Sequence, residues 1–154
     1  MAEKYRILDE PEPSRLSRLS VNPFWIFLAS MLGGAALGWS WFLFNGFAFG
    51  SPTRRREALL VGTGVAGVAL LVLAGSELVA HGYVPESFYP YVSLVFVAYK
   101  LCIAYLLHLT QSRGFELYTH FGGQAKSGLI VVVLAVVLRV KASQWFGPWA
   151  GVFL

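Results

Sequence analysis

A lysine inside an apolar segment is the residue of this sequence with the clearest chemical potential. Lys100 is the tenth residue of the apolar run 91–110, so helical rise places it roughly 15 Å from either end of that run. A lysine stem reaches about 6 Å, which is too short to bring the ammonium fully to a headgroup layer. A charge at that depth costs on the order of 2.5–3.5 kcal/mol on insertion scales, so we expect compensating groups nearby.

Other polar side chains follow the same stripe of this segment. Ser93, Lys100 and His108 are spaced so that helical periodicity places them on one face. Glu77 is the acid that we assign to the interior of a hydrophobic segment, and antiparallel helices would bring it to roughly 10 Å from Lys100. The stripe indicates either a lined pathway or anion site, or a buried charge that is paired for structural reasons.

A second set of residues, His108, Glu116 and His120, could meet on one side of a membrane. Glu116 and His120 are four residues apart, as on one helical face. A structural zinc site uses four ligands, so this set falls short of one. The sequence contains no nucleophile motif, Walker loop or dinucleotide fingerprint. We therefore assign no metal, no cofactor and no catalytic residue, and rank an intramembrane lipid-modifying enzyme third among the possible functions.

The composition indicates that membrane helices position these residues. The chain is 56% hydrophobic and 13% charged, with a mean hydropathy of +0.62, whereas soluble domains carry about 25% charged residues. The net charge of +4 comes from short basic runs beside apolar segments. Such runs suit anionic lipid headgroups, and we expect no nucleic acid partner. The sequence predicts an all-α, polytopic helical membrane protein.

Four hydrophobic segments are predicted within one membrane-embedded domain, residues 21–154. The segments lie at about 23–49, 58–80, 91–110 and 126–146. Residues 1–20 are predicted to form a flexible or amphipathic N-terminal segment that is not a cleaved signal peptide. A span needs about 20 residues, but the last segment has only 11 uninterrupted apolar residues, 128–138. This segment either spans the membrane with its basic side chains extended toward the headgroups, or enters the membrane and returns to the same side.

The basic residues conflict with four ordinary spans. Arg54, Arg55 and Arg56 follow the first segment, and other basic residues precede it. Lys and Arg favour the cytoplasmic side, yet one crossing would separate these two groups. A hairpin that turns at Gly33-Gly34 would place them together, although its turn would need surrounding protein. Four ordinary helices are the prediction, and a first or last segment that enters and returns is the alternative.

Small residues in the first segment form a possible packing face. Ser30, Gly34 and Gly38 are spaced by four, and Asn45 lies seven residues further on the same stripe. Small residues at this spacing let a second helix approach closely. This face indicates either an interface with another chain or packing inside the monomer.

Short motifs over about half of the chain carry a family resemblance. They are Asn22-Pro23, Gly33-Gly34, Asn45, the basic loop, Gln111, His120, Gly122-Gly123 and Ser127. With these motifs the chain resembles small, uncharacterised bacterial inner-membrane proteins, in which we expect a proline where this chain has Ala35. The resemblance implies a helical membrane fold and a bacterial inner membrane, and it implies no activity.

The function predicted from these features is that of a non-enzymatic membrane subunit, accessory factor or assembly factor. Such a protein acts through helix–helix packing in the bilayer, as a homo-oligomer or with other membrane subunits. Arg54, Arg55 and Arg56 would bind anionic headgroups. The alternative is a small oligomeric channel or transporter that uses Lys100 and its polar stripe.

Overall fold

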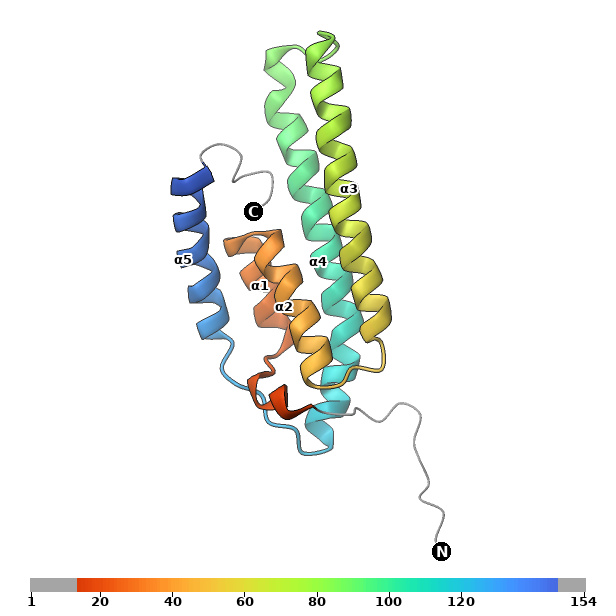
Figure 1. The fold of residues 1–154 in the computed structure, drawn as a ribbon, viewed down its shortest axis with the longest axis vertical. Coiled ribbons are helices and arrows are strands. Elements are labelled where there is room, and N and C mark those ends of the chain that lie inside the picture. Colours follow the sequence, from red (N-terminus) through yellow and green to blue (C-terminus); the bar gives the residue numbers. More distant parts are fainter. Residues whose placement is uncertain (1–13, 147–154) are drawn as a thin grey trace, which may run out of the picture.

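The computed structural model describes residues 14–146, and its regular secondary structure in that range is helical (Figure 1). The elements are η1 Arg15–Leu19, α1 Pro23–Gly33, α2 Ala35–Ala48, α3 Arg54–Ala80, η2 Glu86–Phe88, α4 Tyr89–His120 and α5 Leu129–Phe146. The predicted all-α class is confirmed. Five α-helices take the place of the four predicted segments, because the first segment forms two.

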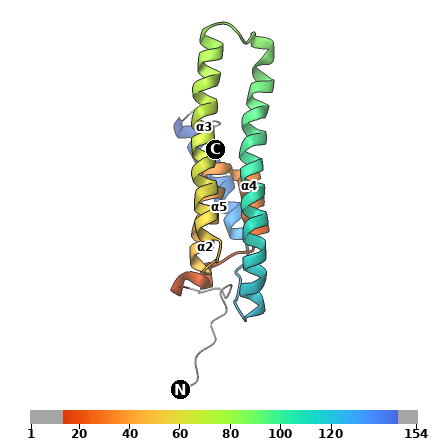
Figure 2. The same cartoon turned by 90° about the vertical axis from the view of Figure 1, so that its right-hand side faces the viewer.

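The longest elements are α3 and α4, which lie side by side as an antiparallel pair (Figures 1 and 2). Their 27 and 32 residues correspond to about 40 and 48 Å of helix. Both are long and apolar enough to cross a membrane. Gly67 lies beneath the Tyr99 ring, whose hydroxyl donates to the Thr63 carbonyl at 2.9 Å. This contact holds the two helices together near the middle of the pair.

The first segment, predicted as a single span, is a helical hairpin in the structure. Helix α1 ends at Gly33 and α2 begins at Ala35. The residue between them, Gly34, has φ +102°, a conformation that residues with a Cβ rarely adopt. A Cβ on Gly38 would overlap the Ser30 side chain, so these two residues mark the closest approach of the hairpin arms. Ser30, Gly34 and Gly38 therefore serve packing within the monomer.

The two arms are short, with 11 and 14 residues, or about 17 and 21 Å. The Asn22 side chain caps α1 by accepting from the Phe24 N–H, and Pro23 occupies the first helical turn, where its missing N–H has no effect. Neither arm alone matches the roughly 30 Å of a bilayer core.

Helix α5 runs parallel to α1 and covers its outer face. A Cβ on Gly33 would overlap Ala135, and one on Gly128 would overlap Trp25, so the backbones approach at both ends of the contact. Between Leu129 and Phe146 the chain is one continuous helix of about 27 Å, with no turn back.

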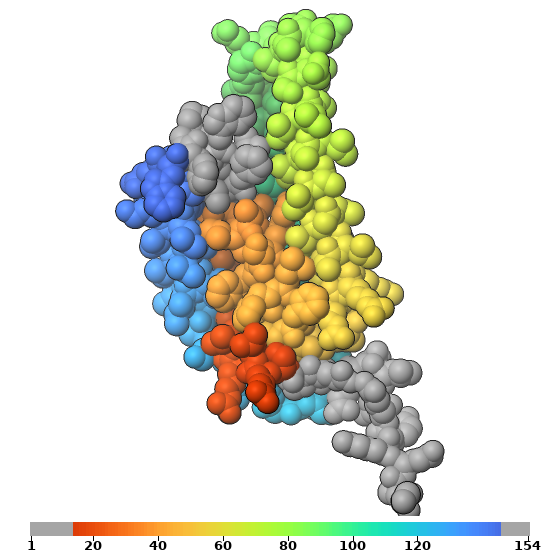
Figure 3. All heavy atoms as spheres, viewed as in Figure 1, coloured from red at the N-terminus to blue at the C-terminus, as the bar shows by residue number. Residues whose placement is uncertain are grey.

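The core lies where the hairpin packs against the N-terminal half of α3 and the C-terminal half of α4. Figure 3 shows from outside that the hairpin lies against this part of α3. Trp39, Phe42, Ile26 and Leu107 are buried there. The upper halves of α3 and α4 extend beyond the hairpin and expose large apolar side chains.

Candidate functional site: a buried polar network at the base of the hairpin

Three polar side chains from three helices meet in the interior at the open end of the hairpin. Asn45, Gln111 and Glu57 are each at most 1% exposed. Asn45 Nδ2 donates to Gln111 Oε1 at 2.9 Å, and Gln111 Nε2 donates to Glu57 Oε2 at 2.8 Å. We call these residues, together with Ser51 and Thr53, the basal network.

The carboxylate of Glu57 determines the direction of the hydrogen bonds. A carboxylate only accepts, so the Gln111 amide must present its NH₂ group to Glu57 and its oxygen to Asn45. Gln111 Nε2 uses its second hydrogen on the Phe42 carbonyl at 2.9 Å. Asn45 donates to the Val21 carbonyl and accepts from the Val21 N–H, both at 2.9 Å. All four amide hydrogens are therefore used and each amide oxygen accepts one hydrogen bond, which satisfies both buried groups.

The other oxygen of Glu57 is held by the loop that leads into α3. Ser51 Oγ donates to Glu57 Oε1 at 2.6 Å and Thr53 Oγ1 donates to it at 2.8 Å. The acid also lies in the first turn of α3, where the helix dipole favours negative charge. A Cβ on Gly46 would overlap the Glu57 carboxylate, so α2 needs a glycine at this point.

The sequence gives little sign that Glu57 is buried, because this acid directly precedes the apolar run and looks like part of the charged loop. Its position after Ser51 and Thr53, in the first turn of a helix, was a usable signal for a capping role. Nothing in the linear sequence pairs it with Gln111, which is 54 residues away.

The basal network places both ends of the hairpin at the same end of the α3–α4 pair. We call this the basic end, because the described chain gathers seven basic residues there: Arg15, Arg18, Arg54, Arg55, Arg56, Arg113 and Lys126. The opposite end, where α3 turns into α4, holds Glu77, His81 and Glu86. The conflict seen in the sequence is thus removed by the hairpin, since the residues before and after it lie together.

Lys100 lies at the other end of the hairpin, near its turn, and is 8% exposed. A cavity of about 160 Å³ there is lined by Ser30, Met31, Ala35, Val97, Lys100, Leu101 and Arg139. Arg139 donates from Nη1 to the Leu32 carbonyl at 2.8 Å. Helix α1 ends here, so its last carbonyls lack helical partners and its dipole favours cations. We call this the tip cavity. The end of the α1 dipole favours the Lys100 ammonium there, whereas the like charge of Arg139 in the same lining opposes it.

The other members of the predicted polar stripe lie elsewhere. Glu77 Oε2 is 3.6 Å from His81 Nδ1, with both side chains largely exposed, at the end of α3. Ser93 is exposed and donates to the Pro90 carbonyl of its own helix. The structure therefore does not gather Lys100, Glu77 and Ser93 around one pathway.

The candidate metal ligands are also separate. His108 stacks on Phe27, with ring centroids 5.7 Å apart, and contacts Ser112 on its own helix. His120 lies at the last residue of α4, against Phe121. Within residues 14–146, no three His, Cys, Asp or Glu side chains are placed to hold a metal ion. His108, Glu116 and His120 thus do not form one site.

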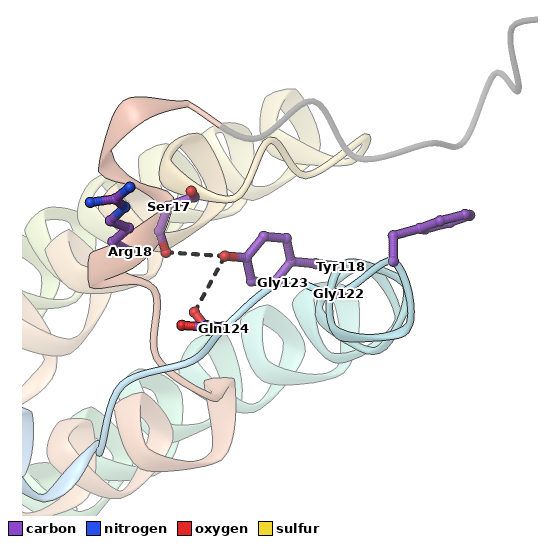
Figure 4. A pocket seen from close by; sticks show the side chains of 7 residues that line it. Ser17, Arg18, Tyr118, Gly122, Gly123 and Gln124 are labelled. Atoms are coloured by element: carbon purple, nitrogen blue, oxygen red, sulfur yellow. Dashed lines mark hydrogen bonds between the residues drawn. The ribbon is translucent and has the colours of Figure 1, made fainter.

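A third feature is an open cavity of about 410 Å³ at the basic end, between η1 and the loop after α4 (Figure 4). The Tyr118 hydroxyl lies between its walls, 3.2 Å from the Ser17 carbonyl and 3.3 Å from the Gln124 carbonyl. We call it the basal cavity.

Comparisons with known proteins give no relative from which a role for these sites could be transferred. No protein family, curated protein or solved structure matches this chain.

Proposed function

We propose that this chain is an integral membrane protein that acts without catalysis, as a subunit, accessory factor or assembly factor, by packing against other helices in the bilayer. The observation that carries the proposal is the apolar surface of α3 and α4. In their most apolar 18-residue windows only 17% and 22% of the residues are buried. Leu70, Leu73 and Leu94 are each more than 60% exposed.

Lipid or another helix must cover this surface. Soluble monomers rarely expose contiguous apolar patches above a few hundred Å², and a helix that is apolar all round belongs in a core or a membrane. A bilayer also explains the charge distribution, because a cytoplasmic basic end satisfies the positive-inside preference. In this placement the hairpin is re-entrant, and α4, α5 and α3 supply the protein surroundings that its turn needs. A bacterial inner membrane is the setting that the sequence resemblance implies.

An outward-facing stripe of α3 supports packing against a further helix. Gly62, Ala66 and Ala69 share one helical face and are exposed, and a Cβ on Gly62 would meet nothing within 4 Å. Small residues at these spacings allow close backbone approach in membranes. This stripe, and not the predicted face with Ser30 and Gly38, is available to a second copy or another subunit.

The test is the native mass of the purified chain, in a mild membrane mimic, with Gly62→Leu and the matched variant Ala74→Leu. Ala74 is exposed on a different face of α3, so both changes add the same side chain to the surface. We expect an assembly larger than one chain that Gly62→Leu dissociates and Ala74→Leu leaves intact. A strictly monomeric chain, or equal effects of the two variants, would contradict the proposal.

A second candidate function, an oligomeric channel or transporter for anions, is favoured by the tip cavity. Re-entrant half-helices that end in mid-membrane are a feature of transport sites, and Lys100 and Arg139 line the cavity at such an end. This function predicts that Lys100→Leu abolishes anion flux into vesicles that contain the reconstituted protein, while assembly is retained. Equal flux with Lys100→Leu and the wild-type chain would exclude it.

A further inference from the structure

We propose that the basal cavity binds the phosphate group of an anionic phospholipid. The inference rests on the membrane placement proposed above and adds a specific ligand site to it. The lining residues are Ser17, Arg18, Tyr118, Phe121, Gly122, Gly123 and Gln124. Figure 4 shows them on two walls, η1 on one side and the end of α4 with its following loop on the other.

The charge of this cavity suits a phosphate. Arg18 is the charged residue among its described lining residues, which include no acid. A guanidinium offers paired N–H groups that match two phosphate oxygens, and it is less strongly hydrated than an ammonium. The Gln124 amide and the Ser17 hydroxyl add polar groups to the lining. The other cations of the basic end raise the local concentration of anions.

The walls are held in place before any ligand binds. Tyr118 is 5% exposed, and its single hydroxyl hydrogen is shared between the Ser17 carbonyl of η1 and the Gln124 carbonyl of the loop. A Cβ on Gly123 would overlap the Tyr118 ring, and Gly122 has φ +85°, so the two glycines let the loop fold back tightly on α4. The Lys126 N–H donates to the Ser20 carbonyl at 2.8 Å, which closes the connection to η1. A pre-organised site avoids much of the entropic cost of binding.

Apolar side chains at the same level favour a lipid over a free phosphate ion. Phe121 lines the cavity and is 55% exposed, and Leu16 and Leu19 project from the same short helix as Arg18 with 52% and 43% exposure. In the membrane placement proposed above, exposed leucines beside arginines suit the interface between headgroups and acyl chains. The site thus presents a cation and polar groups for a headgroup next to apolar surface for acyl chains.

The test is a lipid titration of the purified full chain followed by native mass spectrometry in a mild detergent. The probes are phosphatidylglycerol, phosphatidylcholine and inorganic phosphate, and the variants are Arg18→Gln and Arg113→Gln. Arg113 is an exposed arginine at the same end that does not line the cavity, so its loss lowers the net charge equally. We expect the wild-type chain to bind phosphatidylglycerol in preference to phosphatidylcholine. Binding of phosphatidylglycerol should be about 10-fold weaker with Arg18→Gln and within about 2-fold of wild type with Arg113→Gln.

Further variants and a localisation control make each outcome decisive. If Arg18→Gln does not fold, Gln124→Glu places a negative charge in the opposite wall of the same cavity and should weaken binding by a similar factor. Equal losses with both arginine variants would overturn the site in favour of a diffuse basic surface, and competition by millimolar inorganic phosphate would overturn the lipid as ligand. Alkaline carbonate extraction of cell membranes shows separately whether the protein is an integral membrane protein, so that failure of the lipid site can be told apart from failure of the membrane placement. Retention without lipid selectivity refutes only the site, whereas release of the protein refutes the placement.

Discussion

Replacement of Gln111 by leucine is the most direct test of the basal network. The leucine is close in volume to glutamine, so the change removes hydrogen bonds with little change in packing. Three bonds are lost, one donated to the Glu57 carboxylate, one donated to the Phe42 carbonyl and one accepted from Asn45. A hydrogen bond to a charged group contributes about 1.5–3 kcal/mol and a neutral one about 0.5–1.5 kcal/mol. The partners stay buried and unsatisfied, so we expect a total loss of about 3–5 kcal/mol in the free energy of unfolding.

The assay is reversible unfolding in mixed micelles with a rising fraction of denaturing detergent, followed by tryptophan fluorescence, since the chain has five tryptophans. Gln144→Leu is the matched control, because this glutamine lies exposed on α5 and the same substitution should change stability by less than about 0.5 kcal/mol there. A double-mutant cycle between Asn45→Ala and Gln111→Ala should give a coupling energy of about 0.5–3 kcal/mol. A loss below about 1 kcal/mol for Gln111→Leu, or a coupling near zero, would refute the view that the network holds the hairpin.

Three further predictions concern the hairpin itself. Gly34→Ala should destabilise the protein by about 1–2 kcal/mol in the same unfolding assay, because alanine is strained at φ +102°; a neutral effect would show that the turn is not held in this conformation. Single cysteines at the exposed positions Ser14, Arg55 and Tyr83 should react with a membrane-impermeant thiol reagent from different sides of the membrane. The cysteines at 14 and 55 should react from one side and the cysteine at 83 from the other. Reaction at 14 and 55 from opposite sides would exclude a re-entrant hairpin. Gly46→Ala should cost about 1–3 kcal/mol and displace Glu57, because the new Cβ overlaps its carboxylate, and unchanged stability would contradict the packing described for α2.

Hydropathy and charge counts allowed a correct prediction of the helical class and of the approximate positions of α3 and α4. Such counts depend on neighbouring residues, which the sequence displays directly. Hydropathy predicted one span over residues 23–49, because a continuous apolar run looks the same whether the chain crosses or turns. The positions of the basic residues conflicted with that span and supported the alternative, a hairpin that turns at Gly33-Gly34. Gly33-Gly34 permits a turn, but the turn is stable only if other helices surround it. The structure supplies that surrounding through Ala135 of α5 and Lys100 of α4.

The hydrogen-bond partners of the polar residues were less predictable from the sequence than the positions of the helices. Asn45 and Gln111 are visible in the sequence as amides in or beside apolar segments, yet their contact joins positions 66 residues apart. Glu57 did not stand out in the sequence as a buried residue, and Glu77 was expected near Lys100, because helix register alone gives no lateral arrangement. The tertiary structure buries Glu57 and leaves Glu77 exposed beside His81.

The sequence by itself therefore determined that this chain forms apolar helices with a strongly basic flank, since both properties are sums over local residues. Only the tertiary structure decided which residues face each other. A buried charge or amide is stable only where another element supplies its hydrogen-bond partner, and the identity of that element follows from how all the helices pack together. For this reason the sequence left the hairpin as an alternative to a single span, and the basal network and the two cavities appear only in the folded chain.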